Sequence, residues 1–424
     1  MTSIAVIGAG ITGVTTAYAL ARQGYAVTVF DRNRYAAMET SFANGGQLSA
    51  SNAEVWNSWG TILKGMKWML RKDAPLLMNP KPSWHKYSWM AEFVMNIPHY
   101  EKNTIATTRL AIEARKRMFE IAAEEKIDFD LEKRGILHIY RSKQGYDHAV
   151  KVNRLLEAGG LDRRSVTNEE IHNIEPALDG TFHGGFFTPS DSTGDIHKFT
   201  RGLADASVRR GVRFVGDANV QTLKHGNDGV VVSWNTASET LSQVETDRFD
   251  AIVICAGIAS RKFAAHLGDR VNIYPVKGYS ITINLGDAAS RASAPWVSLL
   301  DDDAKIVTSR LGEGRLRVAG TAEYNGENRD IRHDRVKPLV DWSRDLFPGM
   351  DTSNVVPWAG LRPMMPDMLP RVGSGKRSGV FYNTGHGHLG WTLSAATAEI
   401  IAGHISAAIP AEKPEQSEWL AAAE

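Results

Sequence analysis

The chain has 424 residues, of which 43% are hydrophobic and 23% charged, and its formal net charge at pH 7 is +1. This length predicts two packed lobes rather than one ordinary domain. The near-average composition argues against disordered and fibrous proteins, and the charge balance gives no basic excess for nucleic acid. The single cysteine, Cys255, excludes an intrachain disulfide and fits a reducing, cytoplasmic compartment.

The first 31 residues carry a glycine-rich turn between two predicted strands. Residues 4–7 and 27–30 are short apolar runs, typical of buried parallel strands. A helical pattern covers residues 14–22 between them. The turn that leads into this helix contains Gly8, Gly10, Ile11, Thr12 and Gly13.

The spacing of this turn fits a dinucleotide. Gly8 permits a tight turn, Gly10 lets the backbone approach a pyrophosphate, and Gly13 allows close packing of helix on strand. The helix N-terminus offers N–H groups and a positive dipole end to the phosphates. Asp31, followed by Arg32, ends the second strand, where a carboxylate holds the adenosine ribose and disfavours NADP.

Residues 39–49 form a small, polar and glycine-rich segment. It is either a solvated loop or a loop that wraps the phosphate and ribityl chain of a cofactor. For the second interpretation the candidate residues are Ser41, Asn44, Gly45, Gly46 and Gln47. In the middle of the chain, an apolar strand over residues 250–255 ends in a small turn; the cofactor candidates here are Val220, Ala256 and Gly257.

Near the C-terminus a second glycine turn joins a strand to a helix. The strand covers residues 380–383, and an Ala-rich helix runs from 391 to about 404. Its N-terminus would stabilise the negative charge of a reduced flavin ring. One flavin spanning both glycine turns favours FAD over NAD. The junction residues are Gly385, His386, Gly387, His388, Leu389, Gly390, Trp391 and Thr392.

Several longer stretches resemble the D-amino acid dehydrogenase small-subunit family, within the D-amino acid, glycine and sarcosine oxidase superfamily. The similarity covers nearly the whole chain, through GAGITG, ETSFANGGQLS, LKGMKWMLRKDAPL, STGDIHKFT, YPVKGYSITI, WAGLRPMMPD and NTGHGHLGWT. The resemblance implies an α/β fold with a Rossmann-type FAD-binding domain and an α+β substrate-binding domain with a mixed or antiparallel sheet. The implied FAD-binding pieces are 1–50, 186–260 and 346–424, and the substrate-binding pieces are 51–185 and 262–345. Strand-like runs at 271–285 and 306–322 support the sheet.

The resemblance also implies a reaction. A hydride would pass from the carbon next to the nitrogen of a small amino acid to FAD, giving an imine. Water would then convert the imine to an oxo acid and ammonia or an amine. The implied partners are the amino acid and an electron acceptor, which is oxygen in some members and a respiratory quinone in others.

Arg362 is the strongest candidate for substrate binding. A planar, permanently charged guanidinium grips a carboxylate through two hydrogen bonds, and Arg362 matches the family position with that role. Tyr279 is either a second pocket group or a half-buried strand tyrosine, and Lys277 either lies near the flavin or forms a plain ion pair. His386 either contacts the ring or closes the turn. No metal-ligand pattern and no confident general base are found.

Two positions depart from the family pattern, and both add a group that can carry positive charge. His388 replaces a threonine, and Arg371 replaces an apolar residue. A second carboxylate would use such groups. We therefore expect N-substituted glycines such as iminodiacetate to compete with D-amino acids as substrates, as in an iminodiacetate oxidase.

Residues 59–72 alternate large apolar groups with Lys and Arg. The segment is either a surface helix with its apolar face in the core, which we prefer, or an amphipathic helix on an anionic membrane. No apolar run is long enough to span a bilayer, so we expect at most peripheral contact with the inner face of the cell membrane. Alternatives to the whole interpretation are an NAD-linked dehydrogenase and a flavin-binding protein without catalysis.

Overall fold

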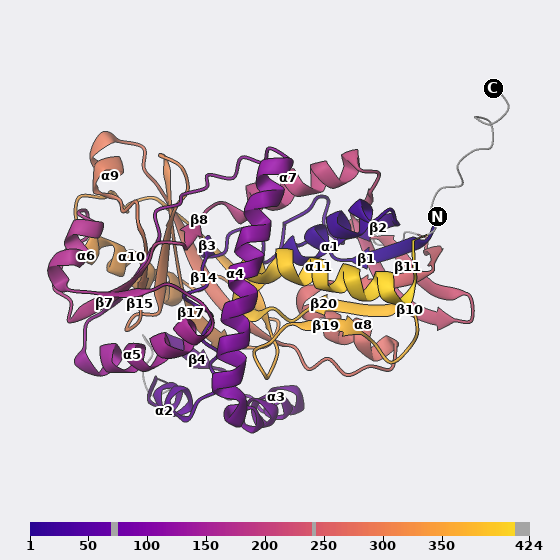
Figure 1. Cartoon of the computed structure of the whole chain (residues 1–424), viewed down its shortest axis with the longest axis horizontal. Coiled ribbons are helices and arrows are strands. Elements are labelled where there is room, and N and C mark those ends of the chain that lie inside the picture. Colours follow the sequence, from indigo (N-terminus) through magenta and orange to yellow (C-terminus); the bar gives the residue numbers. More distant parts are fainter. Residues whose placement is uncertain (69–74, 240–242, 412–424) are drawn as a thin grey trace.

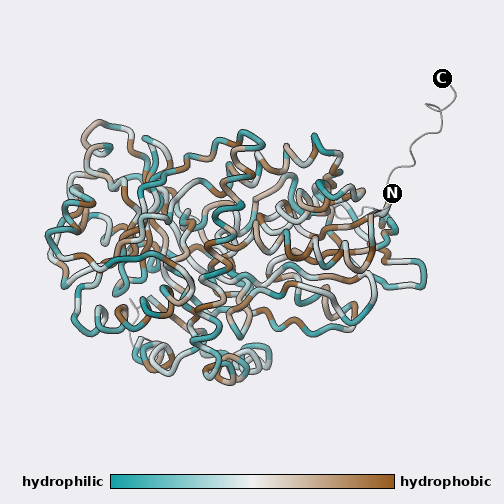
Figure 2. The backbone as a smooth tube through the Cα atoms, in the orientation of Figure 1, coloured by the Kyte–Doolittle hydropathy of each residue, from teal (hydrophilic) through white to brown (hydrophobic). Residues whose placement is uncertain are grey.

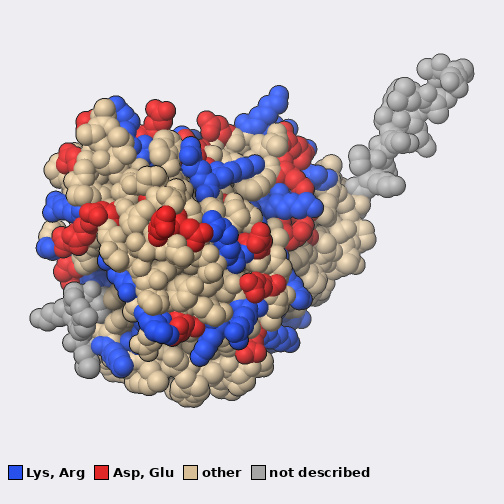
Figure 3. All heavy atoms as spheres, turned by 60° about the vertical axis from the view of Figure 1, so that its left-hand side comes forward, with Lys and Arg blue, Asp and Glu red and all other residues tan. Residues whose placement is uncertain are grey.

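The computed structural model describes residues 1–68, 75–239 and 243–411. Two lobes lie side by side, each built around one large sheet (Figure 1). On the face shown in Figure 3, lysine and arginine are interspersed with aspartate and glutamate, as the near-zero net charge predicts.

A six-stranded sheet forms the centre of the first lobe. Its first strand, β1 (Ser3–Ile7), pairs in parallel with β2 (Ala26–Phe30) on one side and β13 (Ala251–Ile254) on the other. The full order is β19 (Arg371–Ser374), β20 (Val380–Thr384), β13, β1, β2 and β9 (Arg213–Val215), and β19 is antiparallel. Strands from distant parts of the sequence thus meet in one sheet, which confirms the predicted Rossmann-type, discontinuous architecture.

Helices and a small sheet cover the two faces of this sheet. Side chains alternate along β1, so Val6 joins the core under the helices and Ile7 joins the core on the other side. Figure 2 shows hydrophobic stretches running through these buried elements. The helical layer contains α1 (Ile11–Arg22), α4 (Tyr100–Glu124), α7 (Ile196–Arg209) and α11 (Gly390–Ala408). The opposite layer contains β10 (Ala218–Gly226), β11 (Gly229–Thr236), β12 (Glu245–Phe249) and α8 (Ser260–His266).

A nine-stranded mixed sheet forms the second lobe, as predicted. Two of its long strands, β14 (Tyr274–Asn284) and β17 (Arg315–Tyr324), pair with each other, and α10 (His333–Leu346) packs over them. The order is β18 (Val355–Met364), β14, β17, β16 (Ile306–Arg310), β15 (Ser298–Asp301), β5 (Ile136–Tyr140), β7 (Gly184–Thr188) and β6 (Arg164–Val166), with β4 (Leu76–Met78) paired to β17.

Shorter elements surround this second sheet. Its helices are α2 (Trp59–Trp68), α3 (Trp84–Met95), α5 (Lys143–Ala158), α6 (Asn168–Ile174) and α9 (Ala288–Ser293). A two-stranded ribbon of β3 (Gln47–Leu48) and β8 (Ser192–Thr193) lies between the lobes, and the 3-10 turns are η1 (Ile97–His99), η2 (Gly257–Ala259) and η3 (Gly387–Leu389).

The expected domain boundary at residue 346 does not coincide with the sheets. That division assigns β18 to the FAD-binding pieces, but β18 pairs with β14 along its whole length in the nine-stranded sheet. The boundary at residue 186 falls inside β7 of the same sheet. β18 also touches the first lobe, because Met364 at its end forms a β-bridge with His386. The sheets therefore place residues 355–364 with the second lobe, and the remaining division stays a prediction.

Candidate functional site

A cavity of about 1200 Å³ runs between the two lobes. At one end it is lined by the turn after β1 and the end of β2, and at the other by β14, β18 and η3. All the predicted cofactor residues except Gly13 line it, together with Arg362 and Tyr279. The shape is that of an elongated ligand site held by both sheets.

The turn after β1 has the geometry that its three glycines predict. Gly8 has a φ of 105°, which favours glycine. A Cβ on Gly13 would lie 1.8 Å from the carbonyl oxygen of Gly8, so α1 packs on β1 only without a side chain there. A Cβ on Gly10 would meet only the Ser41 hydroxyl, at 3.5 Å. The protein itself therefore leaves open space at Gly10, on the cavity side of the turn.

Asp31 stabilises this turn as well as lining the cavity. Its carboxylate accepts hydrogen bonds from the backbone N–H groups of Ala9, at 2.6 Å, and Asn33, at 2.8 Å. Burial raises the pKa of Asp31, and these two hydrogen bonds oppose the rise. Arg32 pairs with Glu39 across the cavity edge. The ribose contact of Asp31 remains a prediction, but its position at the end of β2 meets that requirement.

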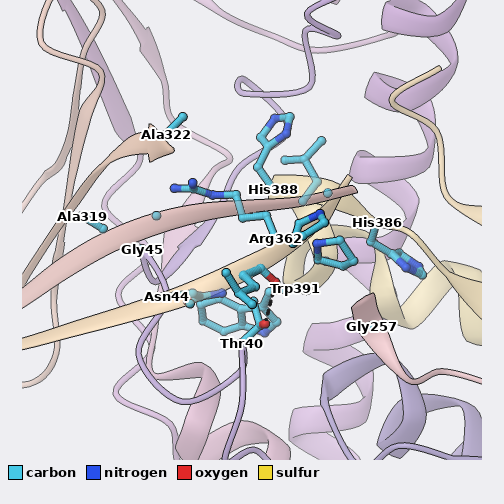
Figure 4. Close-up of a pocket in the computed structure, with 18 of the residues that line it drawn as sticks. Thr40, Asn44, Gly45, Gly257, Ala319, Ala322, Arg362, His386, His388 and Trp391 are labelled. Atoms are coloured by element: carbon cyan, nitrogen blue, oxygen red, sulfur yellow. Dashed lines mark hydrogen bonds between the residues drawn. The ribbon is translucent and has the colours of Figure 1, made fainter. Parts of the chain in front are cut away.

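The loop over residues 39–49 connects the two lobes. The Ser41 hydroxyl accepts from the N–H of Ile11 at 3.0 Å, which ties the loop to the start of α1. The Thr40 hydroxyl donates to the Leu361 carbonyl of β18 at 3.0 Å (Figure 4). Gln47 donates to Ser298 of β15 at 2.8 Å. The loop therefore forms part of the cavity wall and is not a solvated loop.

The C-terminal glycine turn brings two histidines into the cavity wall (Figure 4). The Nε2 atom of His386 lies 2.9 Å from the Thr397 hydroxyl of α11. His388 stacks on Trp56, with ring centroids 4.8 Å apart, and its Nε2 lies 3.2 Å from the Asn52 carbonyl. Within the described ranges, neither His388 Nδ1 nor Trp391 Nε1 has a hydrogen-bond partner.

Burial keeps both histidines neutral. It lowers the pKa of His386 to about 3 and that of His388 to about 4. The expectation that His388 carries positive charge near the pocket is therefore wrong at neutral pH. Arg371, the other departure from the family pattern, is exposed, donates to the Ser374 carbonyl at 2.7 Å and does not line the cavity. Neither residue supplies the second cation from which a dicarboxylate substrate was inferred.

The neutral state of His388 has a measurable effect on stability. Its folded pKa lies below the value of about 6.5 in an unfolded chain, so the unfolded state binds more protons as the pH falls from about 6.5 toward 4. The neutral form of His388 therefore contributes its full stabilisation to the fold above about pH 6.5, and this contribution is lost as the pH falls toward 4. We expect wild type to lose more Tm than His388→Gln between pH 7.5 and pH 5. An equal loss in the two proteins would mean that His388 titrates normally in the fold.

Arg362 of β18 is a half-buried cation that faces the cavity. Its Nη1 donates to the Thr321 carbonyl at 3.1 Å. Burial lowers its pKa to about 10, so it remains protonated at neutral pH. Among the residues that the structure describes, none provides a carboxylate partner for it. A half-buried guanidinium in this state is costly unless an anion enters beside it.

Two residues missed by the sequence reasoning make room for Arg362. A Cβ on Gly278 would lie 2.3 Å from Arg362 Nη1, so the guanidinium lies flat over this glycine of β14. Thr321 has a φ of 61°, an uncommon value for a β-branched residue, and this bulge turns its carbonyl toward Arg362. The signal in the sequence was a glycine inside a strand, which often marks close approach of a ligand or another chain segment.

Lys277 and Tyr279 lie on the other face of β14. The Tyr279 hydroxyl donates to Glu323 at 2.7 Å, and the Lys277 ammonium lies 3.2 Å from the same carboxylate. Tyr279 packs in the apolar core beneath α10. Because Gly278 faces Arg362, the alternation of the strand turns both neighbours away from it. The structure therefore favours the ion-pair interpretation of Lys277 and a buried strand tyrosine at 279, not pocket roles.

Comparison with known proteins places this geometry in a family. The model of the family described as FAD dependent oxidoreductase matches residues 3–403. The chain belongs to this FAD-dependent oxidoreductase family. It is 65% identical over 411 residues to "D-amino acid dehydrogenase 3" of Mesorhizobium japonicum, covering 97% of this chain and 98% of the relative.

Solved structures show the same fold at low sequence identity. Glycine oxidase from Geobacillus kaustophilus aligns with a TM-score of 0.75 and 19% identity, over 98% of this chain and 100% of the other. Iminodiacetate oxidase from Chelativorans sp. BNC1 aligns with a TM-score of 0.69 and 18% identity, over 97% of each chain. This FAD-dependent enzyme thus shares its two-lobed architecture with both, and the predicted family and cofactor are confirmed.

The residues present fit FAD. The open side of Gly10 and the N-terminus of α1 suit the pyrophosphate, and the end of β2 suits the adenosine. The unpartnered Trp391 Nε1 and His388 Nδ1 lie at the opposite end, where α11 directs its N-terminus into the cavity. We expect Asn44–Gln47 and the η3 turn to hold the ring between the lobes. These individual contacts remain predictions.

Proposed function

We propose that the protein oxidises the C–N bond of small D-amino acids. The observation that carries this proposal is Arg362, a half-buried guanidinium without a carboxylate partner in the described chain, in the cavity that the cofactor turns also line. The 65% identical relative bears the name of a D-amino acid dehydrogenase. D-amino acids are favoured over iminodiacetate, because His388 is neutral and Arg371 lies outside the cavity.

The chain's own residues would bind and orient the substrate. Arg362 holds the α-carboxylate, while Trp358 of the same strand helps to wall the site off from water. Bound FAD supplies the two-electron oxidation that converts the amine to an imine, which water hydrolyses to an oxo acid and ammonia. With His386 and His388 neutral, neither repels an incoming ammonium group. Holding the Cα–H bond in one orientation is the main task of the site.

Anaerobic mixing of the purified yellow protein with amino acids tests this function. D-Alanine should bleach the flavin absorbance, whereas L-alanine and iminodiacetate should do so at least about tenfold more slowly. A protein that stays yellow with every D-amino acid would not have this function. Faster bleaching by iminodiacetate than by D-alanine would restore the N-substituted glycine alternative. A colourless protein would return the NAD-linked alternative.

We also propose that a membrane quinone accepts the electrons. Helix α2 has no fully buried residue, but its Ile62 is half-buried and packs against the apolar cluster of Val55, Trp89 and Tyr274, so both interpretations of residues 59–68 stay open; residues 69–72 lie outside the described chain. Trp59 and Met66 of α2 and Trp84 of α3 are 61%, 48% and 85% exposed. Lys67 of the same helix is exposed and adds positive charge for an anionic surface. No helix in the described ranges is long and apolar enough to cross a membrane.

Vesicle flotation checks this surface. Wild type should float with vesicles of phosphatidylcholine and phosphatidylglycerol, and the triple variant Trp59→Ser/Met66→Ser/Trp84→Ser should stay in the soluble fraction. The matched control is Val208→Ser/Ile400→Ser, which removes two apolar side chains of the first lobe that are 54% and 42% exposed. This control should float like wild type. Equal flotation of all three proteins, or none for wild type, would leave oxygen as the favoured acceptor.

A further inference from the structure

The cavity continues past Arg362 into a second, polar compartment. His388, which lines the same cavity, interacts electrostatically with both Arg362 and Glu54 and stacks on Trp56. We call this compartment the polar chamber and define it by the cavity-lining residues Glu54, Tyr140, His148, Asp302 and Lys305.

Lys305 occupies a backbone conformation that lysine rarely adopts. It lies in the loop between β15 and β16 with a φ of 56°, a position that glycine or asparagine usually fills in a hairpin. Its side chain is 40% exposed and opens onto the cavity. Non-glycine residues are uncommon in this conformation, and they cluster at active sites and ligand sites.

The charges of the polar chamber compensate one another. Asp302 pairs with Lys305 and lies 3.6 Å from the Lys64 ammonium. Burial raises the pKa of Asp302, but these two cations outweigh it and bring the pKa down to about 2. On the opposite wall, Glu54 accepts from Tyr100 at 2.6 Å and lies 3.4 Å from His148 Nε2. The hydrogen bond with Glu54 raises the pKa of His148.

Such a chamber discriminates among side chains by charge and polarity. A charged end group would add an uncompensated charge to a wall on which the two carboxylates of Glu54 and Asp302 already face the two ammonium groups of Lys64 and Lys305. An apolar end group would take these polar groups out of water without replacing their hydrogen bonds. An amide or hydroxyl both donates and accepts and leaves the charge balance unchanged.

We propose that the polar chamber receives the substrate side chain and selects D-amino acids with neutral side chains that end in an amide or hydroxyl group. This inference rests on the proposed function, because it takes the α-carboxylate to be held at Arg362. The side chain would then extend past His388 toward Lys305 and Glu54. Lys305 is a specificity-determining residue in this arrangement, and its ammonium donates to the end group.

Steady-state dye reduction by the FAD-loaded enzyme tests the proposal with four substrates. D-Glutamine and D-glutamate differ in charge at one position, D-norleucine is an apolar chain of similar length, and D-alanine does not reach the chamber. In wild type, kcat/KM for D-glutamine should exceed that for D-glutamate and for D-norleucine by about tenfold each. A preference for D-norleucine or D-glutamate would overturn the proposal.

Variants of both walls separate this selectivity from general damage. Lys305→Met should lower the ratio of kcat/KM for D-glutamine to that for D-alanine by about tenfold, and Lys305→Gln, which keeps a donor, by less. The control Lys337→Met removes an exposed lysine of α10 that pairs with Asp341 and should keep the wild-type ratio. Glu54→Gln should raise the ratio of kcat/KM for D-glutamate to that for D-glutamine about fivefold, because one negative charge is removed.

These experiments distinguish a failure of the proposed side-chain selectivity from a failure of the proposed function. Unchanged ratios in Lys305→Met and Glu54→Gln, with normal flavin spectra, would overturn the chamber's role while D-alanine turnover upholds the proposed function. If D-alanine and all other D-amino acids fail to bleach wild-type flavin, the proposed function itself fails. If Lys305→Met loses its flavin, the kcat/KM ratios of Glu54→Gln decide whether the polar chamber selects the side chain.

Discussion

Replacing Arg362 with leucine is expected to lower kcat/KM for D-alanine about a thousandfold while the protein still binds FAD. Removing one partner of a buried charged hydrogen-bond pair costs about 4 kcal/mol, and each 1.4 kcal/mol is about tenfold. Leucine also removes a half-buried cation that has no carboxylate partner in the described chain, so the fold should be no less stable. Steady-state kinetics, flavin spectra and Tm measure the three effects separately.

Two controls sharpen the Arg362 result. Arg371→Leu removes an exposed arginine outside the cavity and should keep kcat/KM within about twofold of wild type. Arg362→Lys keeps the charge but loses the planar fork, and it should recover only part of the activity. Wild-type turnover in Arg362→Leu would show that the carboxylate is held elsewhere, and a similar loss in Arg371→Leu would show that the exposed arginine contacts the substrate.

Gly13→Ala is expected to give a protein that is unstable and carries no FAD. The new methyl group would lie 1.8 Å from the Gly8 carbonyl oxygen, and both atoms belong to backbone elements that cannot rotate away. Separating α1 from β1 would disturb the central strand of the six-stranded sheet, at a cost of about 4 kcal/mol or more. Thermal unfolding and the ratio of flavin to protein absorbance measure the result.

Gly10→Ala is the matched comparison, because its methyl group contacts only the Ser41 hydroxyl at 3.5 Å in the protein. The apo protein should therefore keep its Tm, while its affinity for FAD falls at least about tenfold from contact with the pyrophosphate. The two glycines thus separate a folding role from a binding role. Wild-type FAD affinity in Gly10→Ala would mean that the cofactor takes another path through the cavity.

The two glycine turns were predictable because each role is local. Gly8 and Gly13 act on neighbours within a few residues, so a strand, a turn and a helix in the right order suffice to identify them. Four strands of the six-stranded sheet followed from the same logic, since the expected strands at 4–7, 27–30, 250–255 and 380–383 each precede or follow a recognisable turn. Each of the four appears in the structure within one residue of its expected bounds, whereas β9 and β19 were not predicted.

The faces of β14 could not be predicted from sequence. Lys277, Gly278 and Tyr279 alternate correctly, but a strand buried on both sides gives no indication of which side faces the cavity. The residue that matters there is Gly278, which has no side chain to attract notice. The polar chamber was missed for another reason: its residues come from separate elements, and only tertiary packing brings them together.

Strand β18 has a mechanical consequence for the enzyme. It is hydrogen-bonded to β14 for its whole length, yet Met364 at its end bridges to His386 of the turn that precedes α11. The Arg362 guanidinium and the turn at residues 385–387 are therefore joined through one continuous hydrogen-bonded strand. A bending motion between the lobes cannot change the distance between Arg362 and this turn without breaking these hydrogen bonds. We therefore expect heating to release the flavin and to abolish substrate recognition in a single step.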